Sequence, residues 1–296
     1  MTINKKVTRF IILGILFLFL FSTFSGCQAK LDMQVLTSEI DAGAEETFIV
    51  LHTSDTHLTL CEETDTKDIR TKAKKRTKRF KNLQEQKLEY VIDLAKEKNA
   101  LVVHTGDIMD FPTDANIARA KKFFDDTGCL YVPGNHEPED KESDYYKKLA
   151  AASHRSLDFF VEEVSGVCFV GIDNSDHKMT ATQLAQLKTV VAQNKPIILL
   201  VHAPLYTKDL YDASIVDDGS AYLMAVPEEL MKNYPQDKYE KQKADATTIE
   251  AYNYIVEQTT IKGILCGHLH IDFETKVGNI PQYVVGLDRV RLVTIK

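Results

Sequence analysis

The chain has 296 residues, enough for one large α/β domain or two small ones. Hydrophobic residues make up 44% of the chain and charged residues 27%, which is ordinary for a soluble protein once the first segment is set aside. The formal net charge is −7, and this acidic balance argues against nucleic-acid binding through overall charge.

The first segment has the pattern of an export signal. Three basic residues precede an apolar run over 10–21, which is at the short end for spanning a bilayer. The tetrad Phe-Ser-Gly-Cys at 24–27 resembles a bacterial lipobox, although Phe24 replaces the usual aliphatic residue. We therefore expect a lipoprotein signal peptide over 1–27 with Cys27 lipidated, or alternatively an uncleaved signal anchor. Either would hold the rest of the chain at the extracytoplasmic face of the cell membrane.

The next residues predict a tether and then an α/β domain. Residues 28–45 lack clear periodicity and are expected to be flexible, whereas from residue 46 short β-branched runs alternate with helix-spaced apolar residues. The predicted strands cover 48–52, 101–104, 130–132, 167–172, 197–202 and 261–266. The predicted helices cover 82–98, 115–126 and 181–193. This alternation indicates βαβ units and a largely parallel, buried sheet.

The end of the chain has a different pattern. Runs over 273–277, 282–285 and 289–295 follow one another as strands without helices between them. They predict an antiparallel meander that closes the α/β core. We expect one domain over 46–296, because the remaining polar stretches have too few apolar residues for a core of their own.

Two polar stretches are expected to be inserts in this domain. The first lies at about 60–81, and its part 67–81 has nine lysines or arginines against one aspartate. This basic run fits a solvated helix face or loop, or a patch that attracts anionic substrate or anionic lipid headgroups. The second insert covers 204–250 and contains five tyrosines, and one hypothesis is that it forms a substrate lid.

Five motifs place polar residues just after predicted strands. They are Ser54-Asp55-Thr56-His57, Gly106-Asp107, Gly134-Asn135-His136-Glu137, Val201-His202-Ala203 and Gly267-His268-Leu269-His270. Ligands gather at the carboxyl ends of strands in α/β sheets, so we expect these motifs to converge. The Asp-x-His and His-x-His spacings would put both side chains on one side of an extended segment. Imidazole together with carboxylate favours Zn, Fe or Mn over Ca or Mg.

In this order the five motifs resemble those of the calcineurin-like metallophosphoesterase superfamily, from about Thr47 to the C-terminus. The resemblance implies an α/β fold, a four-layer sandwich of two central sheets flanked by helices. It also implies two divalent or trivalent transition-metal ions, of Mn, Fe or Zn. One ion would be held by Asp55, His57 and His270, a second by Asn135, His202 and His268, and Asp107 would bridge the two.

The resemblance also assigns a proton donor outside the metal ligands. His136 would act as general acid, and Asp110 would be the carboxylate that orients it. The implied reaction is hydrolysis of a phosphomonoester or phosphodiester by metal-activated hydroxide, outside the membrane. The alternative is a non-catalytic, metal-binding surface lipoprotein on the same fold. His136 and Asp110 favour the enzyme, because metal binding alone needs no acid.

The other polar residues near these motifs have less specific expectations. His52 and His104 lie inside predicted strands and are expected in the core or behind the ligands. His154 and His177 lie in polar surroundings, which predicts that they are solvated. Glu137 is a candidate for a supporting or substrate-facing role.

Overall fold

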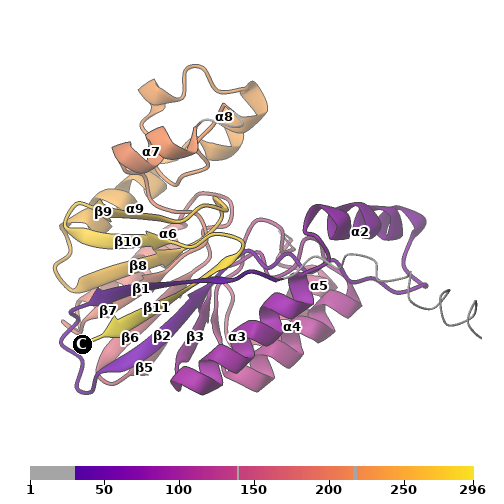
Figure 1. Ribbon diagram of the computed structural model, residues 1–296. Coiled ribbons are helices and arrows are strands. Elements are labelled where there is room, and N and C mark those ends of the chain that lie inside the picture. The colour runs from indigo at the N-terminus through magenta and orange to yellow at the C-terminus, as the bar shows by residue number, and fades with distance from the viewer. Residues whose placement is uncertain (1–30, 139, 216–218) are drawn as a thin grey trace, which may run out of the picture. The chain divides into compact units, whose positions relative to one another are not determined.

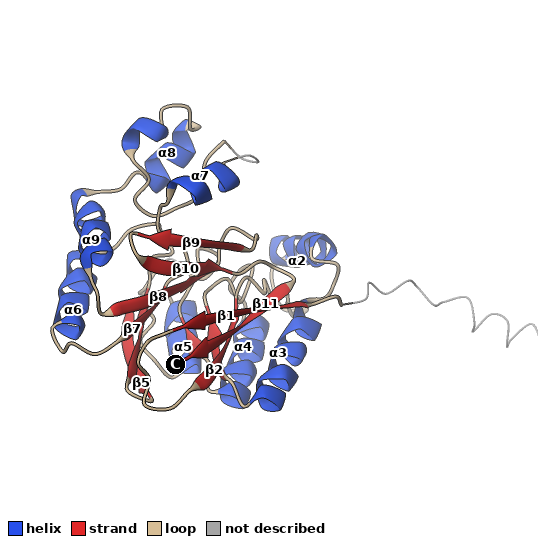
Figure 2. Ribbon diagram, turned by 60° about the vertical axis from the view of Figure 1, so that its left-hand side comes forward, coloured by secondary structure: helices blue, strands red, loops and turns tan. Residues whose placement is uncertain are grey.

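Two β-sheets form the centre of residues 32–296 in the computed structural model (Figures 1 and 2). The structure describes residues 31–138, 140–215 and 219–296. The predicted signal peptide with its lipobox lies outside these described residues. Within them, no helix combines the length and the apolar character needed to cross a membrane.

The first sheet has five strands that come from both ends of the described chain. Their order is β1 (Gln34–Ile40), β11 (Arg289–Ile295), β2 (Phe48–Thr53), β3 (Leu101–His104) and β4 (Leu130–Tyr131). The strands β2, β3 and β4 are parallel, as the βαβ pattern predicted. The strand β11 runs antiparallel to β2 and parallel to β1.

The second sheet has six strands and antiparallel edges. Their order is β5 (Phe159–Val164), β6 (Val167–Ile172), β7 (Ile197–Leu200), β8 (Ile261–Cys266), β10 (Ile280–Val284) and β9 (Phe273–Val277). The four inner strands are parallel, whereas β5 and β9 run antiparallel to their neighbours.

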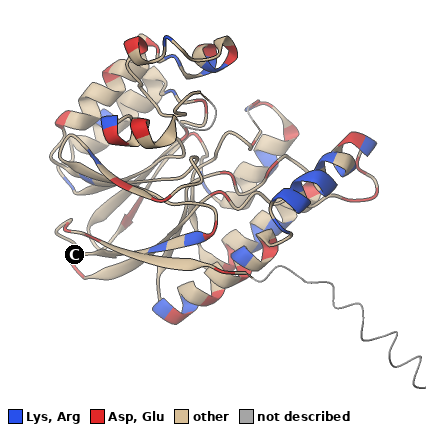
Figure 3. Cartoon of the chain, turned by 45° about the horizontal axis from the view of Figure 1, so that its top comes forward, with Lys and Arg blue, Asp and Glu red and all other residues tan. Residues whose placement is uncertain are grey.

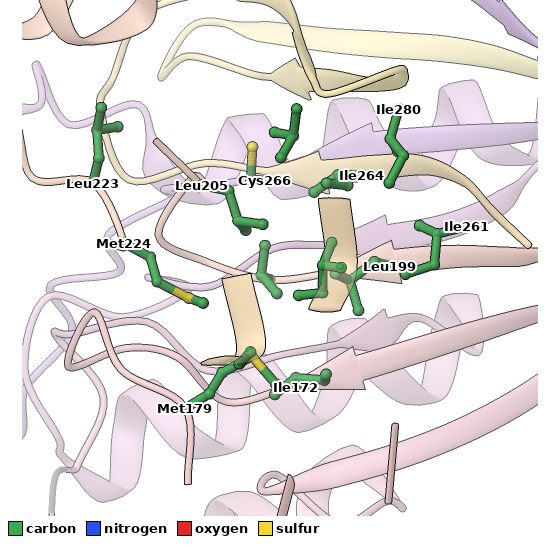
Figure 4. Packing of buried hydrophobic residues seen from close by; sticks show 14 of the residues in the cluster. Ile172, Met179, Leu199, Leu205, Leu223, Met224, Ile261, Ile264, Cys266 and Ile280 are labelled. Atoms are coloured by element: carbon green, nitrogen blue, oxygen red, sulfur yellow. The ribbon is translucent and has the colours of Figure 1, made fainter. Parts of the chain in front are cut away.

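Strand alternation divides the apolar residues among three cores. In β7, Ile198 and Leu200 pack between the two sheets, while Ile197 and Leu199 face the opposite side. Leu199 is seen there among other members of the outer cluster in Figure 4. That outer side is covered by α6 (Ala181–Val191) and α9 (Ala246–Glu257). The outer side of the first sheet is covered by α3 (Gln84–Lys98), α4 (Asp114–Thr127) and α5 (Asp144–Ser153). The four-layer α/β sandwich predicted from the sequence is therefore confirmed.

Local sequence signals fix where these helices begin and end. Thr113 caps α4 by accepting a hydrogen bond from the Asn116 amide, and Gly128 ends the helix in a left-handed conformation. Thr180 and Gln183 form a reciprocal capping box at the start of α6.

Two predictions about the ends of the chain were wrong. The segment 34–40 is the strand β1 rather than part of a flexible tether. Its side chains alternate between exposed and partly buried at a sheet edge, so it lacks the apolar run that marks an inner strand. The predicted antiparallel meander was wrong for β11. This strand does not pair with β9 or β10 but lies in the first sheet, between β1 and β2. The pattern of a single strand does not specify which sheet it joins.

The two inserts have different relations to the core. The basic insert forms α2 (Lys67–Arg79), of which only Ala73 is buried. The tyrosine-rich insert forms α7 (Lys208–Ser214), a short 3-10 turn over Glu228–Leu230, α8 (Gln236–Gln242) and the start of α9. Leu205, Leu223 and Met224 from this second insert belong to the core on the outer side of the second sheet (Figure 4).

Candidate metal centre

The predicted ligands lie in the turns that follow parallel strands of both sheets: β2, β3 and β4 in the first sheet, and β7 and β8 in the second. Their backbone is not extended as the Asp-x-His and His-x-His alternation predicted. Five of the seven have left-handed φ values between 53° and 70°: Asp55, His57, Asp107, His268 and His270. Left-handed backbone is unfavourable for side chains with a Cβ and collects at functional sites. The prediction of extended segments was therefore wrong, although the ligands do converge.

Glycines in these turns allow the loops to approach one another closely. A Cβ added to Gly134 would lie 2.2 Å from Oδ1 of Asp107. A Cβ added to Gly106, whose φ is +94°, would lie 2.5 Å from Nδ1 of His202. Larger residues at these two positions would force apart the loops that carry Asp107, Asn135 and His202.

The first half of the centre contains Asp55, His57, Asp107 and His270. Nε2 of His57 lies 3.0 Å from Nε2 of His270 and 3.7 Å from Oδ2 of Asp107. Oδ1 of Asp55 lies 3.3 Å from Nε2 of His270 and accepts no hydrogen bond from the described residues, although it is buried. One potential ligand atom from each of the four lies within 4.8 Å of the other three.

The second half contains Asp107, Asn135, His202 and His268. Nε2 of His202 lies 3.6 Å from Oδ2 of Asp107, 3.1 Å from Oδ1 of Asn135 and 3.0 Å from Nδ1 of His268. The other ring nitrogen of His202 lies 2.7 Å from the Thr105 carbonyl oxygen. That contact fixes the ring so that Nε2 faces the cluster.

Oδ2 of Asp107 is the atom that the two halves share. It lies within 4 Å of a histidine nitrogen on each side, while Oδ1 accepts a hydrogen bond from the His136 amide. Burial, together with the nearby carboxylates of Glu137 and Asp55, raises the pKa of Asp107 well above its ordinary range. Cations among these carboxylates would relieve that repulsion, and the nitrogen and oxygen donors are those that divalent transition metals bind. The residues therefore fit the implied metals.

Burial favours the neutral form of three predicted histidine ligands. Burial lowers the pKa of His57 to about 4 and also lowers the pKa values of His202 and His268. Neutral imidazole is the form that binds a metal ion, so these groups need release no proton near pH 7.

His136 lies beside the cluster and points into the open cleft with its side chain 31% exposed. Nδ1 of His136 lies 3.0 Å from the Asp110 carbonyl oxygen and 3.3 Å from Oδ1 of Asp110. The structure thus places His136 and Asp110 next to each other, and next to the first half of the centre. Burial lowers the pKa of His136, and the two Asp110 oxygens oppose that shift.

Glu137 supports two of the ligand loops rather than facing the cleft. Its buried carboxylate accepts hydrogen bonds from the backbone amides of Asp107 at 2.9 Å, Gly134 at 2.6 Å and Met109 at 3.2 Å. One side chain therefore joins the loop of Asp107 to the loop of Asn135. In the sequence, only its position directly after Gly134-Asn135-His136 indicated that Glu137 lies near the site.

His177 was expected to be solvated, and this prediction was wrong. Its side chain is buried, and Nε2 of His177 lies 3.0 Å from Nε2 of the predicted ligand His268. Burial lowers the pKa of His177 to about 3. Its polar sequence neighbours gave no indication of this position. His52 and His104 are buried behind the cluster, as predicted, and contact Thr105 and Thr56.

The cluster opens into a cleft of about 940 Å³. Its walls come from both inserts as well as from the ligand loops. Arg79 from the basic insert and Tyr222, Lys238 and Lys241 from the tyrosine-rich insert all line it, together with Lys178. The cleft therefore combines a floor of metal-binding groups with walls in which four basic side chains outnumber the two acidic ones, Asp176 and Glu240.

One family model matches most of this chain. The model of the calcineurin-like phosphoesterase family matches residues 48–272, which is more than half of the chain. A search of curated protein sequences found no match.

Similar solved structures share little sequence with this chain. A dimetal phosphatase from Danio rerio is 12% identical, with 81% of this chain and 88% of that one covered at a TM-score of 0.48. The protein TT1561 of Thermus thermophilus is 13% identical, with 82% and 91% covered and a TM-score of 0.46. The NAD nucleotidase of Haemophilus influenzae is 16% identical, with 81% and 45% covered and a TM-score of 0.39. The family model, the two-sheet fold and the clustered donors together show that the chain belongs to the calcineurin-like phosphoesterase family.

Proposed function

We propose that this protein is a binuclear phosphoesterase that hydrolyses phosphomonoesters or phosphodiesters at the extracytoplasmic face of a membrane. The observation that carries the proposal is the position of Oδ2 of Asp107 between two sets of donors. The first set is Asp55, His57 and His270, and the second is Asn135, His202 and His268. One shared carboxylate oxygen between two such sets is what a bridged pair of ions requires.

When bound, the two ions would supply an activated water and neutralise charge on the phosphoryl oxygens. The protein's own groups would do the rest. The seven ligands would hold the two ions at the floor of the cleft. Nδ1 of His136 contacts Asp110, which leaves Nε2 as the ring nitrogen available to the substrate. His136 would donate a proton from Nε2 to the departing alkoxide.

The cleft walls support an anionic substrate. Arg79, Lys178 and Lys241 line the cleft beside the metal-binding groups. Basic residues are concentrated along α2 (Figure 3). Among the described residues of 67–81, Arg76 alone has a carboxylate within ion-pairing distance. In a chain with a net charge of −7, this local excess of cations would attract a phosphate ester to the cleft.

The proposed location depends on the N-terminal sequence. The basic residues, the apolar run over 10–21 and the tetrad ending in Cys27 support export and lipidation. In cells given a radiolabelled fatty acid, the wild-type chain should incorporate label and sediment with membranes. Cys27→Ala should lose the label. Membrane association without any label in the wild type would favour a signal anchor.

The activity is tested on the full chain in detergent, stripped of metal and reloaded with Mn, Zn or Fe. The substrates are para-nitrophenyl phosphate and bis-para-nitrophenyl phosphate. We expect turnover of at least one of them that depends on added metal and disappears with chelator. A protein that binds two equivalents of metal but hydrolyses neither these esters nor alkyl phosphates would be a metal-binding protein instead.

A further inference from the structure

The helix α2 touches the metal centre through one narrow face. Ile69, Ala73, Arg76 and Phe80 are less exposed than the basic residues around them and recur at the spacing of one helical stripe. Thr77 on the adjoining turn contacts Thr59, two residues after the ligand His57, with 2.6 Å between the hydroxyl oxygens. This basic insert is therefore docked against the loop that carries the first ligands.

Arg76 binds the carboxylate of Asp110 through two of its guanidinium nitrogens. Nε donates to Oδ2 at 2.7 Å, and Nη2 donates to Oδ1. The Asp110 side chain is fully buried, whereas that of Arg76 is 19% exposed. Paired donation from the planar guanidinium fixes the carboxylate in orientation as well as in position.

Asp110 in turn contacts two functional rings. Its Oδ1 lies 3.2 Å from Nδ1 of His57 and 3.3 Å from Nδ1 of His136. The same carboxylate therefore lies behind a predicted metal ligand and behind the predicted acid. Any rotation of Asp110 would disturb both rings.

Phe80 holds the face of the same ligand. Its ring is stacked on the ring of His57, with 4.8 Å between centroids and 9° between planes. The guanidinium carbon of Arg76 lies 5.0 Å from the Phe80 centroid. Arg76, Phe80 and His57 thus contact one another in series.

We propose that Arg76 and Phe80 are positioning residues for the first half of the centre, and that α2 clamps His57 through its ring face and through Asp110. The proposal rests on the proposed function for the ligand role of His57. It assigns the basic insert a task in metal retention that its exposed charges do not indicate.

The test measures Mn²⁺ binding to the metal-free full chain by isothermal titration calorimetry. Asp55→Ala removes a ligand of the first half alone, so the equivalent that it loses identifies the first half. We expect Arg76→Gln to weaken that equivalent by about 10–100-fold and to leave the other unchanged. Arg76→Lys keeps the charge but not the paired donation and should recover only part of the loss, while Phe80→Leu should weaken the same equivalent.

Arg70→Gln on the exposed part of α2 is the matched control, and circular dichroism checks that each variant is folded. A mutant cycle adds a second criterion. In an Asp110→Asn background, Arg76→Gln should cause little further loss, because Arg76 acts through that carboxylate. Wild-type binding in Arg76→Gln and Phe80→Leu would overturn the proposal. Equal weakening of both equivalents, or the same loss in Arg70→Gln, would also overturn it.

The outcomes separate this proposal from the proposed function. Selective weakening of the first equivalent in a chain without esterase activity would support the clamp and reject the enzyme. Metal-dependent ester hydrolysis with unchanged Mn²⁺ binding in both α2 variants would support the enzyme and reject the clamp.

Discussion

The two halves of the metal centre are held in place by different parts of the molecule. In the second half, Nδ1 of His202 contacts a backbone carbonyl, and Oδ1 of Asn174 accepts hydrogen bonds from the amides of His202 and Ala203. In the first half, His57 contacts the side chains of Phe80, directly after α2, and of Asp110, and the side chain of His270 is 31% exposed. His202 of the second half is thus held by groups that follow strands of the two sheets, whereas His57 of the first half is held by side chains of the basic insert and of Asp110.

This difference indicates that the ligands of the two ions in one bridged site can be held in place by different kinds of contact. The turns that follow strands of the α/β core fix His202 in the second half. The first half needs contacts that the core does not supply, so its ion should respond more strongly to changes in the surrounding loops. The predictions below test how separate the halves are, starting from the residue that belongs to both.

The largest effect is expected for Asp107→Asn, because the shared oxygen loses its charge. We expect turnover to fall by roughly 10³-fold or more and metal content to fall below two equivalents. Steady-state kinetics and metal analysis of the reloaded protein check this outcome. Two retained equivalents with activity within tenfold of wild type would mean that Asp107 does not join the halves.

His136→Ala should act on catalysis without emptying either half. We expect turnover of alkyl phosphates to fall by about 10²–10⁴-fold, with both metals retained. Turnover of para-nitrophenyl esters should fall much less, because that leaving group needs little protonation. The measurement is kcat across esters of increasing leaving-group pKa. A uniform decrease across the series would contradict the acid role.

His177→Phe probes the support of the second half. Loss of its contact with His268 should weaken the second metal equivalent by about 10–100-fold and leave the first unchanged. Exposed His154, which pairs with Asp125 away from the centre, provides the control His154→Phe. Calorimetric titration with Mn²⁺ measures both. If His177→Phe weakened the first equivalent instead, the two halves would not be independently supported.

The smallest effect is expected from the exposed charges of α2. Replacing Lys74 and Lys78 by Gln should lower kcat/KM a few-fold at low ionic strength. In 0.5 M salt the Debye length is roughly 4–5 Å, so the difference from wild type should disappear. The matched control replaces Lys121 and Lys122 on α4, which are exposed but paired with Asp125 and Asp126. An equal loss in the control would assign the effect to net charge rather than to α2.

Much of the fold was predictable because inner strands and covering helices have distinct periodicities. The runs 101–104, 167–172 and 261–266 match β3, β6 and β8. The strands β1 and β5 were missed, since edge strands are partly exposed and lack continuous apolar runs. The crossing of β11 into the first sheet depends on pairing between distant segments, which a local pattern does not encode.

The candidate site was predictable to the extent that its residues stand in short motifs. All seven predicted ligands converge, and His136 lies beside Asp110. The left-handed backbone at Asp55 and His57 was not predictable, because it results from contacts between loops after folding. His177 was missed as a site neighbour, and no specific contact was predicted for Arg76, since each lies in a polar stretch and reaches the centre only through the tertiary fold.

The pairing of β1 with β11 limits how far the domain can move if Cys27 carries a lipid. An 18-residue tether over 28–45 would have allowed roughly 60 Å of extension. Because β1 begins at Gln34, only six residues separate it from Cys27, and the seven Cα-to-Cα steps between them extend to at most about 25 Å. The catalytic domain would then work within a thin layer above the bilayer. A phosphate ester would then have to enter that layer to reach the cleft.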